Sequence, residues 1–185
     1  MRANFDNKLS ELNKKLLSMA AMTEQIIAMS IKSLEEQDTK LARETVEFDA
    51  KINEAEREVE RICLNRLLQQ QPVFAEDLRR VSAALKMITD IERVGDQSAD
   101  IADLNIQLIK KKQKWDLSDI SEMARAATQM VNDAIDAYVN DDENLARKVI
   151  SSDDKIDELF VKTKDKIIDE IAADKANGEK AIDTL

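Results

Sequence analysis

The chain has 185 residues, of which 43% are hydrophobic, 36% charged and only 3% aromatic, with one proline and two glycines. So few turn-forming and aromatic residues argue against a sheet protein and predict long helices. A net charge of -10 would repel a phosphate backbone and argues against general nucleic-acid binding. No run approaches the roughly 20 apolar residues of a membrane span. The single cysteine, Cys63, excludes an internal disulfide, so a reduced cytoplasmic setting is the simplest interpretation.

Sparse breaks in the first half of the chain predict three long helices. The first is expected over residues 4–36. Asp38 offers an N-cap for a second helix that reaches about residue 70, where Pro72 would stop it. A third helix is expected from residue 74 or 75 to about residue 112.

The second half of the chain shows the same order. A break near residue 115 precedes a fourth helix over 118–138, and a fifth is expected over 143–174. The turn Asn177-Gly178 then leads into the start of a sixth helix at 179–185.

An internal repeat relates the two halves at an offset of 104 residues. Asp38 then matches Asp142, and Leu-Ala-Arg at 41–43 matches Leu-Ala-Arg at 145–147. We therefore predict an all-α fold of tandem three-helix bundles. The first repeat would span residues 1–114 and the second, which lacks most of its third helix, residues 115–185.

The incomplete second repeat carries a further expectation. The predicted fourth and fifth helices have apolar stripes, and their third partner is present only as Ala181, Ile182 and Leu185. An empty groove would expose an apolar patch of a size that monomers rarely tolerate. We expect the native protein to continue for about 35–45 residues, or another subunit to cover the groove by two-fold packing or helix exchange.

The predicted third helix contains an acidic stretch that is unfavourable for a helix. Like charges four residues apart destabilise a helix by roughly 0.2–0.5 kcal/mol per pair, and Gly95 costs about 1 kcal/mol relative to alanine. Glu92 falls on the heptad seam that should face partner helices. A bound cation would relieve the repulsion. The stretch holds five acids and one base: Asp90, Glu92, Asp96, Asp100, Asp103 and Arg93.

The residue types restrict the chemistry of such a site. The chain has no histidine and one cysteine, so it cannot make a zinc site, and its ligands would be oxygens suited to Mg²⁺, Ca²⁺, Mn²⁺ or ferric iron. Without histidine there is no Ser-His-Asp set, and there is no Gly-rich phosphate loop, so a conventional enzyme is not expected. The alternative is that the acids form a solvated face that binds nothing.

Residues 85–102, LKMITDIERVGDQSADIA, resemble the signature of the PhoU family. The resemblance implies two tandem three-helix bundles with an acidic metal motif on the third helix. It implies Glu92, Asp96 and Asp100 as metal ligands, with Asp49, in the acidic second-helix motif, as the contributor from the second helix. The metal would be iron, magnesium or manganese. Asp100 and Gln97 stand where many members have Asn and His, Asn53 replaces an acid of the second-helix motif, and the second copy of the main motif is missing.

The same resemblance implies a function. The chain would be a non-catalytic cytoplasmic regulator of phosphate uptake and phosphate-starvation signalling. Its partners would be the ATPase subunit of a phosphate ABC transporter and a sensor histidine kinase, with only peripheral contact with the membrane, and it would form a homo-oligomer, expected to be a dimer. The alternatives are a structural helical scaffold without metal and, less favoured, a metal-dependent phosphate-handling enzyme.

Overall fold

The computed structural model describes residues 2–67, 74–110 and 118–173, and every regular element within these ranges is a helix. The all-α fold class is confirmed. No stretch of the described helices combines the length and the hydrophobicity that crossing a membrane demands. The elements are α1 (Arg2–Glu35), α2 (Thr39–Ile62), the π-helical segment η1 (Cys63–Leu67), α3 (Ala75–Lys110), α4 (Ser118–Asn140) and α5 (Glu143–Ala173).

The predicted boundaries of α1, α3, α4 and α5 lie within two residues of the observed ones. The second helix differs, because its α-helical hydrogen bonding ends at Ile62 and widens to a π-helix over Cys63–Leu67. Its predicted end near residue 70 and the predicted sixth helix at 179–185 lie outside the described residues.

The turns before α2 and α5 have the same geometry. Gln37 and Asp141 both adopt a φ of 53° in the left-handed region. The following caps, Asp38 and Asp142, each accept a hydrogen bond on Oδ1 from the backbone N–H three residues later, at 3.1 and 3.0 Å. Each cap also donates its own N–H to the carbonyl five residues earlier. In each turn the left-handed residue ends one helix and the aspartate side chain caps the start of the next. These matching bonds support the 104-residue repeat.

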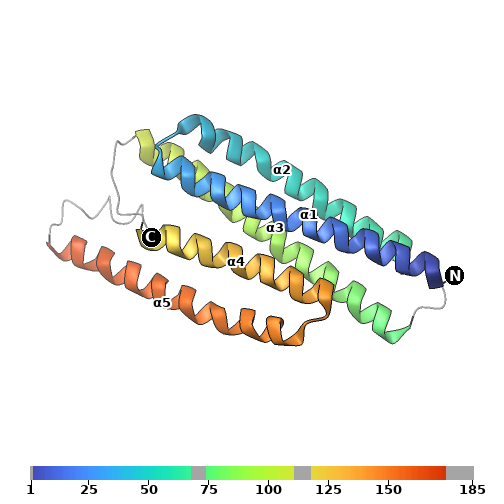
Figure 1. The fold of residues 1–185 in the computed structure, drawn as a ribbon. Helices are drawn as coiled ribbons and strands as arrows, with labels where there is room; N and C mark the ends of the chain where they lie inside the picture. The colour runs from blue at the N-terminus through green and yellow to red at the C-terminus, as the bar shows by residue number, and fades with distance from the viewer. Residues whose placement is uncertain (1, 68–73, 111–117, 174–185) are drawn as a thin grey trace.

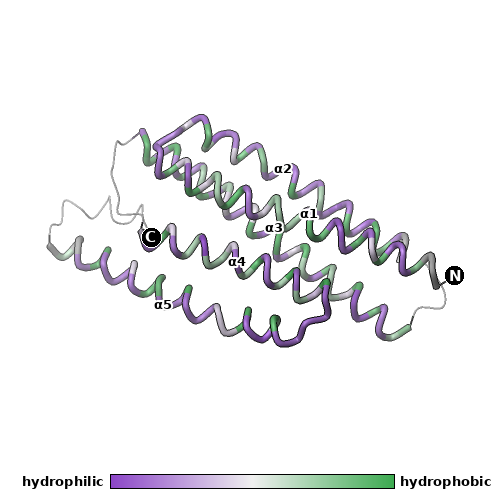
Figure 2. Tube along the Cα trace, viewed as in Figure 1, coloured by the Kyte–Doolittle hydropathy of each residue, from purple (hydrophilic) through white to green (hydrophobic). Residues whose placement is uncertain are grey.

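Helices α1, α2 and α3 form a bundle around one apolar core. Figure 2 shows hydrophobic segments recurring along these helices, interspersed with hydrophilic ones. Such amphipathic helices bury their apolar stripes against one another. The largest fully buried apolar side chains in the bundle are Leu12, Leu16, Met19 and Ile26 of α1, Ile52, Val59 and Ile62 of α2, and Val81 and Ile88 of α3.

Helix α4 joins the second repeat to this bundle by packing on α1 (Figure 1). Ile135 of α4 is 1% exposed and belongs to the main core. The Tyr138 hydroxyl donates a 2.9 Å hydrogen bond to the carbonyl of Arg80, and burial raises the pKa of Tyr138 to about 12. Arg80 also forms an ion pair with Asp141 in the turn after α4. Helix α4 and the turn after it are therefore docked on the α1–α3 bundle through both apolar and polar contacts.

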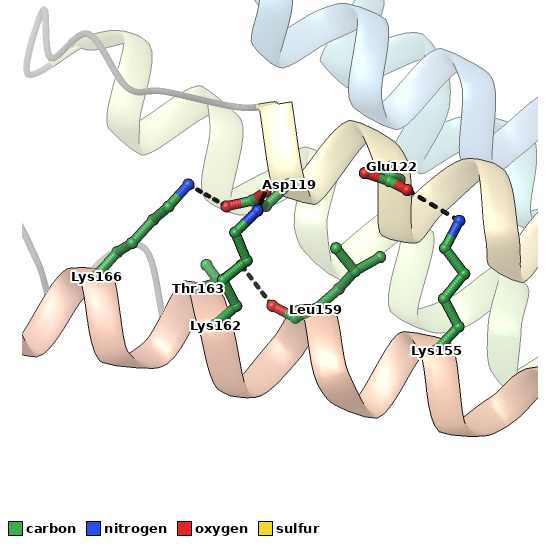
Figure 3. A network of polar contacts seen from close by, with 7 residues as sticks. All are labelled: Asp119, Glu122, Lys155, Leu159, Lys162, Thr163 and Lys166. Atoms are coloured by element: carbon green, nitrogen blue, oxygen red, sulfur yellow. Dashed lines mark hydrogen bonds and ion pairs between the residues drawn. The ribbon is translucent and has the colours of Figure 1, made fainter.

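Helix α5 is held against α4 by ion pairs (Figure 3). Asp119, whose side chain is 10% exposed, accepts hydrogen bonds from Lys162 at 2.8 Å and from Lys166. The hydrogen bonds from Lys162 and Lys166 lower the pKa of Asp119. Lys155 approaches Glu122 at 2.9 Å one helical turn further along. The lysines on this side of α5 are thus directed toward α4.

An open groove remains between α3 and the α4–α5 hairpin. Its volume is about 1020 Å³, and apolar side chains from all three helices line it. Ile150 of α5, at its edge, is 75% exposed. The lining includes Met87 and Val94 of α3, Met130 and Ala134 of α4, and Val149 and Ile150 of α5.

Candidate functional site

The acidic site is organised by a close approach of α2 and α3 at Gly95. A Cβ atom placed on Gly95 would lie 3.0 Å from Cδ1 and 3.3 Å from Cγ2 of Ile52, and 3.4 Å from Oδ1 of Asp49. Ile52 is fully buried. A larger residue would therefore press on a side chain in the close-packed core. This contact explains why α3 tolerates a glycine in its middle.

Asp49 of α2 lies in this contact with one carboxylate oxygen unsatisfied. Its Oδ2 accepts a 2.7 Å hydrogen bond from Nδ2 of Asn53, one helical turn later. Its Oδ1 is buried and has no hydrogen-bond partner. Burial, followed by the negative charge of Asp96, raises the pKa of Asp49, and Asp100 raises it further. A buried carboxylate oxygen beside other carboxylates is stabilised when it binds a cation or a proton.

Glu92 of α3 faces the same cluster from a half-buried position. Burial raises the pKa of Glu92, and the negative charges of Asp96, Glu56 and Asp49 raise it further, in that order. Arg93 lowers that pKa, but its effect is the smallest of these. Three acids and one base therefore act on the charge of Glu92.

The four predicted ligands are neighbours but do not converge on one point. Asp49 interacts with both Asp96 and Asp100, and Glu92 interacts with Asp49 and Asp96. Asp96 and Asp100 are exposed. Among the residues that the structure describes, no three Asp, Glu or Cys side chains are arranged so that they could hold a metal ion. With the side chains as they stand, the cluster is a patch of negative charge, and direct coordination requires some of them to rotate.

Glu56 belongs to this cluster, although the sequence motif did not single it out as a ligand. It lies seven residues after Asp49, and two residues seven apart share one face of a helix. The charge of Glu56 raises the pKa of Glu92 across the α2–α3 contact. The seven-residue spacing of acids on α2 was the signal that could have found it.

The predicted heptad seam of α3 is rotated relative to the observed buried face. Leu78, which lies on the same seven-residue repeat as Glu92, is 51% exposed, and Glu92 is half-buried at the flank of the buried face. The difference arises because hydrophobicity was used to predict which residues of α3 are buried, whereas the centre of its buried face contains small and polar residues. The observed buried residues are Asp77, Val81, Ala84, Ile88, Ile91, Gly95, Ser98, Ala102, Asn105 and Leu108.

Asn105 shows how a polar residue is accommodated on that face. It is 1% exposed, and its Nδ2 donates to the carbonyl of Ser30 at 2.9 Å and to Oγ of Ser33 at 2.8 Å, both on α1. Buried amides are normally paired in this way. These bonds fix the position of α1 against α3 beyond the acidic cluster.

Known proteins resemble this chain in both sequence and structure. A protein from Clostridium acetobutylicum, described as a phosphate-specific transport system accessory protein PhoU homolog, is 32% identical over 95% of this chain and 80% of its own length. A homolog from Aquifex aeolicus with the same description is 30% identical over 95% of this chain and 79% of its own length.

Two crystal structures share the fold. The structure of PhoU from Pseudomonas aeruginosa superimposes with a TM-score of 0.88 and 26% identity, covering 97% of this chain and 86% of that one. The phosphate transport system regulatory protein PhoU from Streptococcus pneumoniae gives a TM-score of 0.83 and 26% identity, covering 92% and 80%. The family model described as the PhoU domain matches residues 16–104 and 120–185. The chain belongs to the PhoU family.

Proposed function

We propose that this protein is a non-catalytic regulator of phosphate uptake. The observation that carries the proposal is its likeness, over most of its length, to proteins named as accessory or regulatory proteins of phosphate transport. The absence of histidine from the sequence fits a regulator better than an acid–base enzyme. A scaffold of long packed helices suits a protein that acts by contacting other proteins.

The proposed partners are the ATPase subunit of a phosphate ABC transporter and a sensor histidine kinase. The protein would work in the cytoplasm, at the inner face of the cell membrane, and reach the membrane only through these partners. In this position it would pass the state of the transporter to the kinase and so control phosphate-starvation genes. The names of the relatives support the link to the transporter, and the kinase follows as the proposed output.

A deletion and complementation experiment tests the regulatory role. A bacterium that lacks its own PhoU should express a phosphate-starvation reporter even in phosphate-rich medium, and this chain should restore repression. The purified ATPase subunit should retain the protein on an affinity column. Normal reporter control in the deletion strain, or failure of the well-folded chain both to restore repression and to bind either partner, would refute the proposal.

We further propose that the acidic cluster binds a metal ion, with Mg²⁺, Mn²⁺ and iron as candidates. Support comes from the unpartnered buried Oδ1 of Asp49 and from the raised pKa values of Asp49 and Glu92. Asp96 and Asp100 would complete an all-oxygen donor set after rotation of their exposed side chains. Such ligands suit hard cations. Bound metal would offset the repulsion between the carboxylates and tie α2 to α3.

Metal content and thermal stability distinguish this site from a solvated acidic face. Metal that binds only the folded state adds RT ln(1 + [L]/Kd) to stability, so the melting temperature should rise with Mg²⁺, Mn²⁺ or ferric iron. The Asp96→Asn variant should lose this response. Asp103→Asn, an exposed acid on the same helix, is the matched control and should keep it. If no metal raises the melting temperature of the wild-type protein, the cluster is a solvated face of a scaffold.

A further inference from the structure

Three positions that hold bulky apolar residues in the α1–α2 hairpin hold smaller or polar residues in the α4–α5 hairpin. In the first repeat Phe48 of α2 is 8% exposed and belongs to the main core, and Met22 and Met29 of α1 pack against the same core. The 104-residue offset, which the matching turns support, aligns each of them with a residue of the second repeat. The aligned residues are Ala126, Asp133 and Ser152.

A cavity of about 420 Å³ lies between α4 and α5 where these smaller residues stand, and all three of them line it. Gln129 and Lys155 also line it, and they are unchanged from Gln25 and Lys51 of the first repeat. The loss of bulk at three positions therefore accounts for the opening. Its volume falls within the range of about 300–1,000 Å³ that small-molecule sites occupy. This α4–α5 cavity is separate from the acidic cluster, which α2 and α3 form.

One end of the α4–α5 cavity carries more positive than negative charge. Lys155 of α5 reaches Glu122 of α4 at 2.9 Å, as Figure 3 shows. Lys155 and, to a smaller extent, Arg125 lower the pKa of Glu122, so both cations act on this one carboxylate. Arg125, which also lines the cavity, stands where the first repeat has Ala21. Its guanidinium is available to a ligand carboxylate, which arginine binds through two parallel hydrogen bonds.

The other end of the cavity carries a negative charge. The Asp133 carboxylate accepts a 2.7 Å hydrogen bond from Nε2 of Gln129, which is a neutral donor and leaves the charge uncompensated. Asp133 lies eight residues after Arg125, which places their Cα atoms about 12 Å apart along the helix axis. Half-buried Ala126 and Met130 line the cavity between them. Two opposite charges are thus separated by an apolar wall.

We propose that the α4–α5 cavity binds a linear zwitterion of the ω-amino acid class. The ligand carboxylate binds Arg125, its ammonium group binds Asp133, and its hydrocarbon chain lies on Ala126 and Met130. A ligand with a single charge satisfies only one end of the cavity. An α-amino acid is excluded because its two charges stand too close together to reach both ends. The proposal is independent of the role in phosphate transport and of metal binding at the acidic cluster.

Calorimetric titration of the purified chain with 6-aminohexanoate tests the ligand class. We expect saturable binding of one ligand per chain. Hexanoate lacks the ammonium group, hexylamine lacks the carboxylate, and glycine lacks the separation, so each should bind at least about tenfold more weakly. No saturable binding of 6-aminohexanoate up to about 10 mM would overturn the proposal. Equal binding of hexanoate, hexylamine or glycine would also overturn it, because the site would then not require two separated charges.

Variants of the cavity test its location. Arg125→Ala and Asp133→Asn each remove one charged end and should weaken binding about tenfold. Ser152→Phe and Ala126→Met introduce the residues of the first repeat, so they should fill the cavity and abolish binding. Asp136→Asn, an exposed acid on α4 outside the cavity, is the matched control and should keep the wild-type affinity.

Circular dichroism confirms that each variant is folded, and the two filling variants check one another if one of them disturbs the hairpin. Binding that survives in a folded filling variant would place the ligand elsewhere and refute the assignment. Binding that neither charge removal weakens would refute it as well, because Arg125 and Asp133 would then not hold the ligand.

Discussion

Replacing Gly95 with alanine has two opposing effects on stability: it improves the helix propensity of α3 and it crowds the packing at the acidic cluster. Alanine favours a helix interior by about 1 kcal/mol over glycine. The new Cβ would lie 3.0 Å from Cδ1 of Ile52, a side chain that is fully buried. Overpacking of this kind costs about 1–3 kcal/mol. We therefore expect Gly95→Ala to lower the free energy of unfolding by about 1 kcal/mol, although the substitution improves the helix.

Urea unfolding followed by circular dichroism measures this change. Ile52→Val removes the Cδ1 atom that the new Cβ would meet, and alone costs about 0.5–1.5 kcal/mol. In its presence Gly95→Ala should become neutral or stabilising, so the two substitutions should couple by about 1 kcal/mol. Gln97→Ala, at an exposed position on the same helix, is the control and should have little effect. If Gly95→Ala stabilises the protein by about 1 kcal/mol in both backgrounds, α2 and α3 are free to separate and the close approach has no energetic weight.

Three further predictions concern the acids. Because folding raises the pKa of Asp49, protonation of this carboxyl stabilises the folded state. This contribution is complete below the ordinary pKa of 3.8 and is lost as pH rises through the folded-state pKa. Asp49→Asn should therefore stabilise the metal-free protein by about 0.5 kcal/mol at neutral pH and not in acid, as pH-dependent urea unfolding would show. The lowered pKa of Asp119 has the opposite sign: its contribution is present above 3.8 and lost as pH falls through the folded-state pKa. Asp119→Asn should speed amide exchange in α5 at neutral pH, and unchanged exchange would show that this ion pair does not hold the helix. Asn53→Asp removes the hydrogen-bond donor to Asp49 and adds a negative charge. The free energy of unfolding of the metal-free protein should therefore fall by about 1 kcal/mol. A melting temperature that the substitution leaves unchanged, with and without Mn²⁺, would contradict this account of the cluster.

The helices and their turns could be predicted from sequence because their signals are local. Asp38 and Asp142 precede apolar periodic segments, and each side chain caps the helix that follows. The repeat offset also followed from short matching segments. Pairing distant helices was harder. The packing of α4 on α1 uses Ile135, and nothing in the periodicity of α4 says which helix that residue meets.

The predicted acidic residues are neighbours in the structure, whereas the geometry of their cluster could not be predicted from the sequence. The sequence shows that Gly95 is unfavourable for a helix. The reason for a glycine at this position is the close approach of Ile52, which depends on the rotation of α2 about its axis. The same rotation brings Glu56 to Glu92. Burial of Asn105 depended on acceptors from α1 that are more than 70 residues away in the chain. Hydrophobic periodicity carries no information about such partners, so a seam assigned from apolar residues was rotated.

Asp119 and Asp49 are two acids in opposite environments, because lysines neutralise the first and, within the described residues, no base pairs with the buried oxygen of the second. Asp119 is nearly buried and two lysines from α5 neutralise it. Asp49 has a buried oxygen without a partner, although basic residues flank the cluster in sequence. Lys51 instead lies 4.5 Å from the ring centre of Phe48, and Arg93 makes an exposed 3.9 Å contact with Asp90. A single lysine directed inward would relieve the repulsion, as the α4–α5 contact demonstrates within the same chain. An unneutralised cluster at the contact between two core helices therefore costs stability, and a proton, a bound cation or a protein partner would each offset that cost.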